Sequence, residues 1–417
     1  MDKLDDLLEA VEREIDQKSR ILKNGWLKYL DFNYIPPNPR HREEEIKEIC
    51  VRLIENVTHG STGNILIYGN PGTGKTMSFH IAKRISEQIL SKKNVENYEI
   101  VYTSATSPNL SKILSEICKK LGSEVPARGL SIREYLSYIN SFAKEKYLHI
   151  CIDEFDKLLE NSRRKQYTED LIYYLTRTEN ISATLITNKI DLAKSITDAR
   201  VLSSLDTINT IYFKAYTKEQ CKDILLERIN LAFREGVFSE DAVDFLAEHI
   251  AECGGDIRNG LSILKFCGNY LTSRKLNRVD LKLMKELIWK HDIQKDGELL
   301  MKTLSLTDKI IVAAVYSLLL ELKTERIDSG DVFARQDYFR TLLNRNGISR
   351  DSFSVYLTRL STNGVIGIEK EWKSKRPGSK SYVYLKYSRN AVKYMLENDP
   401  TLKPVLEFIA QTIRGSS

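Results

Sequence analysis

A glycine-rich octapeptide, Gly69-Asn70-Pro71-Gly72-Thr73-Gly74-Lys75-Thr76, offers the clearest chemistry in this sequence. It fits the pattern GxxxxGK[ST], and it lies between a short apolar run and a helical pattern. Glycines let successive backbone N–H groups turn inward around phosphate oxygens, and the following helix N-terminus adds partial positive charge. Lys75 is placed to reach the β- and γ-phosphates, and the Thr76 hydroxyl to ligate Mg²⁺. The loop predicts a site for ATP or ADP with Mg²⁺; a chance glycine-rich turn is the alternative.

A second motif is the apolar run 148–152, which ends in the adjacent carboxylates Asp153 and Glu154. Asp153, at the end of a predicted strand, is placed to hold Mg²⁺, largely through water. Glu154 would then polarise the attacking water as general base. A solvated acidic turn is the alternative interpretation. Beside the glycine-rich loop, the pair favours ATP hydrolysis.

Alternating strand and helix patterns must position both motifs. Strands are expected over 64–68, 99–103, 147–152, 183–187 and 207–213, with helices between them. This alternation predicts a mostly parallel sheet that is covered on both faces. We assign residues 1–215 to this α/β domain, which includes an amphipathic lead helix over 1–23.

Two further modules follow. Residues 216–300 show successive helical patterns and no strand pattern, which predicts a helical module. From residue 301 we expect helices to about Gly364 and then two β-prone runs, 365–370 and 381–387, separated by a basic segment. Helices followed by a hairpin with a basic tip are typical of a winged helix, to which we assign residues 301–417.

Charge is concentrated toward the C-terminus. Residues 301–417 hold 19 lysines and arginines against 12 acidic residues, a net charge of +7, so the total of +6 leaves −1 for residues 1–300. A basic C-terminal quarter suggests contact with a polyanion, with solvated surface charge as the alternative. The six cysteines lack CxxC spacing, which indicates buried reduced thiols. The acidic start is unlike a signal peptide, and no run approaches the ~18 apolar residues of a membrane span, so we expect a cytoplasmic protein without a membrane partner.

The motifs Gly-Asn-Pro-Gly-Thr-Gly-Lys-Thr and Ile-Asp-Glu-Phe-Asp resemble those of the AAA+ ATPases. The resemblance implies that Asn188, at the end of the next predicted strand, orients water toward the γ-phosphate. It implies that Arg200 is an arginine finger that enters a neighbouring subunit's nucleotide, although the family's basic residue two positions later is replaced by Leu202. Arg258 would contact the phosphates from the lid, as the sensor-two residue. Guanidinium groups suit these roles because each can donate two parallel hydrogen bonds to phosphate oxygens. The alternative is that these arginines form surface ion pairs.

The segment 33–43 narrows the resemblance to one branch of the family. Its turn and its His-Arg-Glu run resemble a segment that packs beside adenine, which implies roles for Tyr34, Pro36 and Arg42. Residues 121–136 resemble a DNA-facing insertion, with Arg128 as the candidate contact. With a winged helix added, the domain order resembles the archaeal Orc/Cdc6-like replication initiators. The resemblance implies an α/β AAA+ P-loop domain with a parallel sheet and a helical lid, followed by an α+β winged-helix domain.

That family implies an ATP-switched, nucleoid-associated protein that binds double-stranded origin DNA and helps to recruit the replicative helicase. A paralogous initiator is a further candidate partner, and hydrolysis would be slow. Two other classes stay open. One is an ATP-binding transcriptional regulator that uses its winged helix at promoters. The other is a translocating or clamp-opening AAA+ machine, which would form stable rings and turn over ATP quickly.

The candidate DNA contacts lie on two elements of the winged helix. The recognition helix, over 349–362, would enter the major groove while the wing lies along a neighbouring groove. The polar face of that helix offers Arg350, Ser354, Thr358 and Arg359, and the wing offers Lys373, Lys375, Arg376 and Lys380. Each neutralised phosphate would contribute about −0.9 to the slope of log affinity against log salt. A solvated basic hairpin, or a winged helix that contacts protein, is the alternative.

Overall fold

The computed structural model describes residues 15, 19–37, 39–106, 109–123, 130–159, 165–189, 196–206, 208–372 and 379–415. The chain divides into two compact units, Met1–Met284 and Lys285–Ser417, and the division falls within the helix α13 (Leu281–Thr303). The predicted domain boundaries at 215/216 and 300/301 remain proposals. Most of the predicted lead helix over 1–23 lies outside the described residues. No helix in the described part of the chain is both long and apolar enough to cross a membrane.

A five-stranded parallel sheet forms the centre of the first unit, with the order β2-β3-β4-β1-β5. Its strands are β1 (Ile65–Gly69), β2 (Tyr98–Ser104), β3 (Tyr147–Asp153), β4 (Ile181–Thr187) and β5 (Asn209–Phe213). Every residue of β3 and β4 is buried, because parallel strands of this kind are covered on both faces. The predicted α/β architecture is confirmed.

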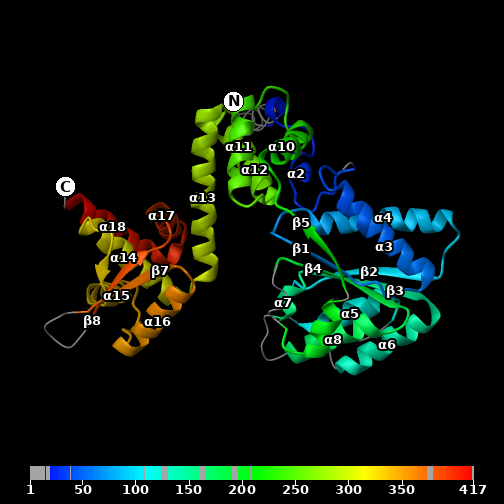
Figure 1. The fold of residues 1–417 in the computed structure, drawn as a ribbon. Coiled ribbons are helices and arrows are strands. Elements are labelled where there is room, and N and C mark those ends of the chain that lie inside the picture. The colour runs from blue at the N-terminus through cyan, green and yellow to red at the C-terminus, as the bar shows by residue number, and fades with distance from the viewer. Residues whose placement is uncertain are drawn as a thin grey trace, which may run out of the picture. The chain divides into compact units, whose positions relative to one another are not determined.

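Helices cover both faces of this sheet (Figure 1). On one face lie α3 (Glu43–His59) and α4 (Lys75–Lys92). The other face is covered by α5 (Leu110–Lys120), α6 (Ile132–Glu145) and α8 (Lys165–Arg177). Two shorter helices complete the domain, α7 (Asp156–Leu159) and α9 (Ala199–Asp206), whereas α2 (Trp26–Tyr29) packs against the lid helix α10. The two apolar layers bury both faces of the sheet, and the loops at the carboxyl ends of its strands lie at one edge.

The lid consists of α10 (Lys218–Ala232), α11 (Glu240–Glu252), α12 (Ile257–Arg274) and the start of α13. Local side chains fix where these helices begin. Thr217 forms a capping box with Gln220 at α10, and the Ser239 and Asp256 side chains accept from backbone N–H groups at α11 and α12. The helical lid that the sequence predicts is confirmed.

The second unit is built on the buried helix α14 (Leu306–Glu321), whose residues 310–319 are all buried. Around it lie α15 (Ser329–Leu342), α16 (Arg350–Thr362), α17 (Arg389–Asn398), the 3₁₀ turn η2 (Pro400–Leu402) and α18 (Lys403–Gly415). An antiparallel sheet of order β6-β8-β7 completes the winged helix, with β6 (Ile327–Asp328), β7 (Ile366–Trp372) and β8 (Ser379–Leu385). The expectation of helices alone up to Gly364 was wrong, since β6 precedes it. Two residues are too short for a strand pattern, and only the pairing of Ile327 with Val383 and of Asp328 with Tyr382 creates this strand.

Candidate nucleotide-binding site

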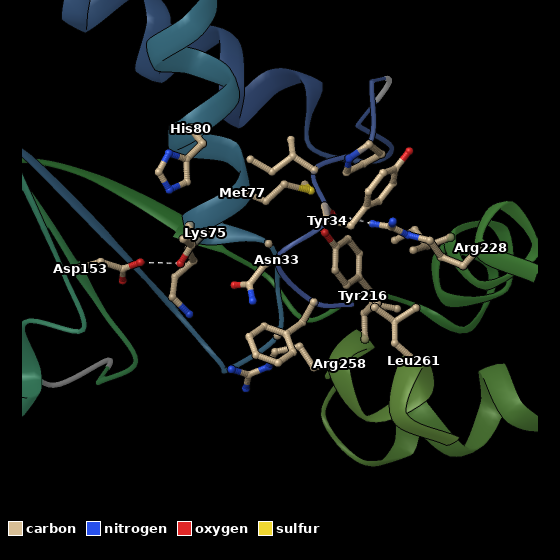
Figure 2. Close-up of a pocket in the computed structure, with 18 of the residues that line it drawn as sticks. Asn33, Tyr34, Lys75, Met77, His80, Asp153, Tyr216, Arg228, Arg258 and Leu261 are labelled. Carbon is tan, nitrogen blue, oxygen red and sulfur yellow. Dashed lines mark hydrogen bonds between the residues drawn. The ribbon is translucent and has the colours of Figure 1, made fainter. Parts of the chain in front are cut away.

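A cavity of about 590 Å³ in the first unit gathers residues from the glycine-rich loop, the strand ends and the lid (Figure 2). Its volume lies within the roughly 300–1,000 Å³ that is typical of small-molecule sites. The predicted site residues that line it are Tyr34, Pro36, Gly72, Gly74, Lys75, Thr76, Asp153, Glu154, Asn188 and Arg258. The residues that follow β1, β3 and β4 meet because the carboxyl ends of parallel strands share one edge of the sheet, while Tyr34 and Pro36 come from the segment before α3 and Arg258 from α12.

The glycine-rich loop connects β1 to α4 in a conformation that requires glycine. Gly72 and Gly74 have φ angles of 74° and 91°, in the left-handed region that other residues rarely adopt. A Cβ atom on Gly72 would lie 1.8 Å from Asp256 Oδ1, so the lid also approaches this position closely. The Thr73 hydroxyl donates to the Asn70 carbonyl at 2.8 Å and closes the loop, with Pro71 between them. A loop of this kind before a helix N-terminus binds phosphate through backbone N–H groups.

Lys75 begins α4 and is buried under the loop. Its Nζ donates to the carbonyls of Gly69 and Asn70 at 2.8 Å each and to Asn188 Oδ1 at 2.9 Å. Burial is the main cause that lowers the pKa of Lys75 to about 8. The three acceptors of this ammonium are neutral oxygens. Phosphate oxygens would place negative charge beside it, so the residue fits a polyphosphate ligand.

Asp153, at the end of β3, is hydrogen-bonded on both of its oxygens. Oδ2 accepts from Thr76 Oγ1 at 2.5 Å and from the Tyr102 hydroxyl at 3.0 Å, while Oδ1 accepts from the Glu154 amide at 2.7 Å. Within the described ranges, no cluster of three or more His, Cys, Asp or Glu is arranged to hold a metal ion. The pair of Thr76 and Asp153 fits Mg²⁺, because that ion commonly takes one or two protein ligands and completes its shell with phosphate and water.

The candidate general base follows directly. Glu154 has a φ angle of 53°, an uncommon conformation for a residue other than glycine, and its Oε2 accepts from Lys157 Nζ at 2.5 Å. Strained backbone of this kind is frequent at active sites. The buried Asp156 holds Asn188 in place, because Asp156 Oδ1 accepts from the backbone N–H of Asn188 at 3.2 Å. Glu154, the predicted general base, and Asn188, the predicted water-orienting residue, therefore follow the adjacent strands β3 and β4.

The opposite side of the cavity carries aromatic and aliphatic residues. The guanidinium of Arg228 lies 4.7 Å from the ring centre of Tyr34, and Pro36, Met77 and Leu261 also line this part. A planar base can stack on such surfaces. Arg42 is buried behind the loop, where it donates to the Thr73 carbonyl at 2.9 Å and the Lys214 carbonyl at 2.6 Å. Its contact with the base stays a prediction.

Four lining residues, His80, Tyr102, Tyr216 and Arg228, were missed by the sequence reasoning, as was Asp256, which lies against Gly72 of the loop. Asp256 stands two residues before Arg258 in the sensor-two segment, so the sequence did carry a signal for it. Tyr216 follows β5 and stacks on Arg42 at 4.0 Å. No pattern in the sequence marks the other three, because only the fold brings them to the cavity.

Other predicted residues lie elsewhere. Arg200 is exposed on α9, where Asp198 accepts from its Nη2 at 2.6 Å. On α16, Arg350, Ser354 and Thr358 are exposed. Arg359 pairs with the buried carboxylate of Asp308 at 2.6 Å, and Lys380 pairs with Asp328 at 3.3 Å. Arg128, Lys373, Lys375 and Arg376 lie outside the described residues. These roles remain predictions.

The fold and this cavity define an AAA+ nucleotide-binding protein. A family profile described as an AAA domain matches residues 58–196, and one described as a Cdc6 AAA+ ATPase-type lid domain matches residues 222–286.

The chain belongs to the ORC1-type DNA replication proteins. It is 30% identical over 362 residues to ORC1-type DNA replication protein 1 of Sulfurisphaera tokodaii, which covers 83% of each chain. It is 29% identical over 346 residues to the ORC1-type protein of Methanosphaera stadtmanae, covering 81% of this chain and 86% of that one. The ORC1 protein of Aeropyrum pernix, solved in complex with DNA, superposes with a TM-score of 0.73 and 26% identity, over 92% of this chain and 98% of that one.

Proposed function

We propose that the protein is an ATP-dependent initiator of DNA replication that binds origin DNA and uses slow ATP hydrolysis as a switch. The observation that carries this proposal is a cavity in which the glycine-rich loop, the strand-end carboxylates and the lid residue Arg258 meet. A nucleotide in such a cavity would contact the α/β core and the lid together. Its γ-phosphate would therefore change how the lid is held.

Each part of the chemistry falls to a residue of the cavity. When bound, Mg²⁺ would neutralise charge on the phosphates, held by Thr76 and Asp153. Lys75 would donate to phosphate oxygens instead of to the carbonyls that it now contacts. Glu154 would accept the proton of the attacking water, and Asn188 would orient that water. Lys157 donates to Oε2 of Glu154, so the attacking water would be met by the other oxygen, Oε1, or by Oε2 after the ion pair opens.

The DNA partner is inferred from the second unit and from one relative. The winged helix presents α16, whose exposed face carries Arg350, Ser354 and Thr358. The Aeropyrum pernix protein with the same fold was solved with DNA. By family membership we extend the proposal to double-stranded origin DNA, to recruitment of the replicative helicase and to cooperation with a paralogous initiator.

A footprinting experiment on the chromosomal origin tests the proposal. We expect the full-length protein to protect discrete origin sequences with ATP and Mg²⁺, and the pattern to change with ADP. Promoter fragments of equal length and base composition serve as the control. Absence of an origin footprint with ATP bound would contradict the DNA-recognition part, and equal protection of promoters would favour a transcriptional regulator.

A further inference from the structure

The sensor-two arginine is held by a carboxylate of its own helix. Asp256 Oδ1 accepts from Arg258 Nε at 3.0 Å, and Oδ2 accepts from Arg258 Nη2 at 2.9 Å. This is a forked, charge-assisted pair, the geometry in which a guanidinium also binds a phosphate. Two of the donors that a γ-phosphate could use, on Nε and Nη2, are therefore already engaged by Asp256.

The same carboxylate lies against the phosphate-binding loop. A Cβ atom on Gly72 would come within 1.8 Å of Asp256 Oδ1 and 2.4 Å of Asp256 Cγ, so the acidic group is in close contact with the loop backbone. Both Asp256 and Arg258 also influence the pKa of Lys75, in opposite directions, which agrees with a position beside the phosphate site. A polyphosphate in the loop would meet a fixed negative charge at this wall.

Capping of α12 does not by itself require this charge. Asp256 Oδ1 accepts from the Arg258 amide at 3.0 Å, as the N-cap residue of the helix. Asparagine caps helices about as well as aspartate does. Compared with an amide, the carboxylate adds a second acceptor for the guanidinium and a negative charge beside Gly72.

We propose that Asp256 is a positioning residue that competes with the γ-phosphate for Arg258. Asp256 retains the guanidinium while no triphosphate is present, and it releases the guanidinium when the γ-phosphate arrives. The lid thus responds to ATP more than to ADP, and ATP binds less tightly than the loop alone would allow. This inference rests on the proposed nucleotide site and adds a means by which that site is regulated.

The test measures dissociation constants of the full-length protein for ADP and for a non-hydrolysable ATP analogue, both with Mg²⁺. Asp256→Asn keeps the cap and removes the competing charge. We expect it to bind the ATP analogue about threefold to tenfold more tightly, as expected for a partly exposed ion pair, and to change ADP binding less. Asp280→Asn is the matched control, because Asp280 also caps a lid helix, accepting from the Leu283 amide at 2.8 Å. It should leave both constants unchanged.

The double variant Asp256→Asn/Arg258→Ala separates the two contributions of the carboxylate. If Asp256 acts through Arg258, most of the gain from Asp256→Asn disappears in the Arg258→Ala background. If Asp256→Asn bound the ATP analogue as tightly as the wild type or less tightly, the proposal would be overturned. A weaker affinity is the result expected of a residue that orients Arg258 toward the phosphate. A full gain without Arg258 would overturn it as well. Failure of the wild-type protein to bind either nucleotide would instead contradict the proposed function.

Discussion

The nucleotide cavity and the exposed face of α16 are built in opposite ways. The cavity collects Lys75, Asp153, Asn188 and Arg258 from four separate parts of the first unit, and Lys75 and Asp153 are buried. The candidate DNA-binding face belongs to one helix, with its polar residues at helical spacing and open to solvent. In the cavity each side chain depends on its neighbours, whereas on α16 each exposed side chain would contact DNA largely independently of the others.

This difference predicts how the two regions respond to substitution. Buried, mutually hydrogen-bonded groups act as a unit, so one replacement removes most of the function. Exposed groups contribute separately and in smaller amounts.

The largest effect is expected from Glu154→Gln. Loss of the general base should slow ATP hydrolysis by roughly 10²–10⁴-fold, while ATP binding is retained. Single-turnover hydrolysis and equilibrium binding measure the two properties. Glu116→Gln is the matched control, because Glu116 is also paired with a nearby lysine, Lys120, but lies on the exposed side of α5. Unchanged turnover in Glu154→Gln would assign the base to another residue.

Lys75→Ala should come next. We expect ATP binding to weaken by roughly 100-fold or more, since hydrogen bonds to charged groups contribute about 1.5–3 kcal/mol each. Titration with a fluorescent ATP analogue provides the measurement. Lys83→Ala is the control, because Lys83 lies on the same helix and also donates to a strand carbonyl, that of Ile100. Equal losses in both variants would mean that α4, and not the phosphate contact, had been damaged.

The pH dependence of binding should be intermediate in size. The pKa of Lys75 is lowered to about 8 by burial, and phosphate would raise it again because it favours the cation. Above pH 8 binding must therefore take up a proton, and the affinity for ATP should fall about tenfold between pH 7 and pH 9. Calorimetry at pH 9 in buffers of different ionisation enthalpy would detect the uptake. A constant affinity over this range would show that Lys75 stays charged without nucleotide.

The smallest effects are expected on α16. Arg350→Ala should reduce the magnitude of the log–log salt slope of DNA binding by about 0.9 and leave thermal stability unchanged. Arg359→Ala should also lower the melting temperature, since it removes the partner of the buried Asp308 carboxylate. Binding assays over a salt series and thermal melts distinguish the two variants. An unchanged slope in Arg350→Ala would place the phosphate contacts elsewhere.

Much of the first unit could be predicted because its signals are local. The apolar runs of β3 and β4 predicted buried strands, and the loop at 69–76 fits a pattern with a known chemical purpose. The two-residue strand β6 could not be predicted, because it exists only through its pairing with β8. Tyr102 could not be predicted as a partner of Asp153 either, since nothing in the sequence of β2 shows which strand lies beside it.

The sequence alone specifies which chemical groups are present and in which order, from the glycine-rich loop to Arg258. It could do so because phosphate binding and strand formation depend on short, contiguous patterns. The tertiary structure alone decided which charges face one another. It brought Asp256 against Gly72 and Asn188 against Lys75, and it paired Arg359 with Asp308. Contacts of this kind join residues that are far apart in the chain, so only packing of the whole fold fixes the partner of each charge.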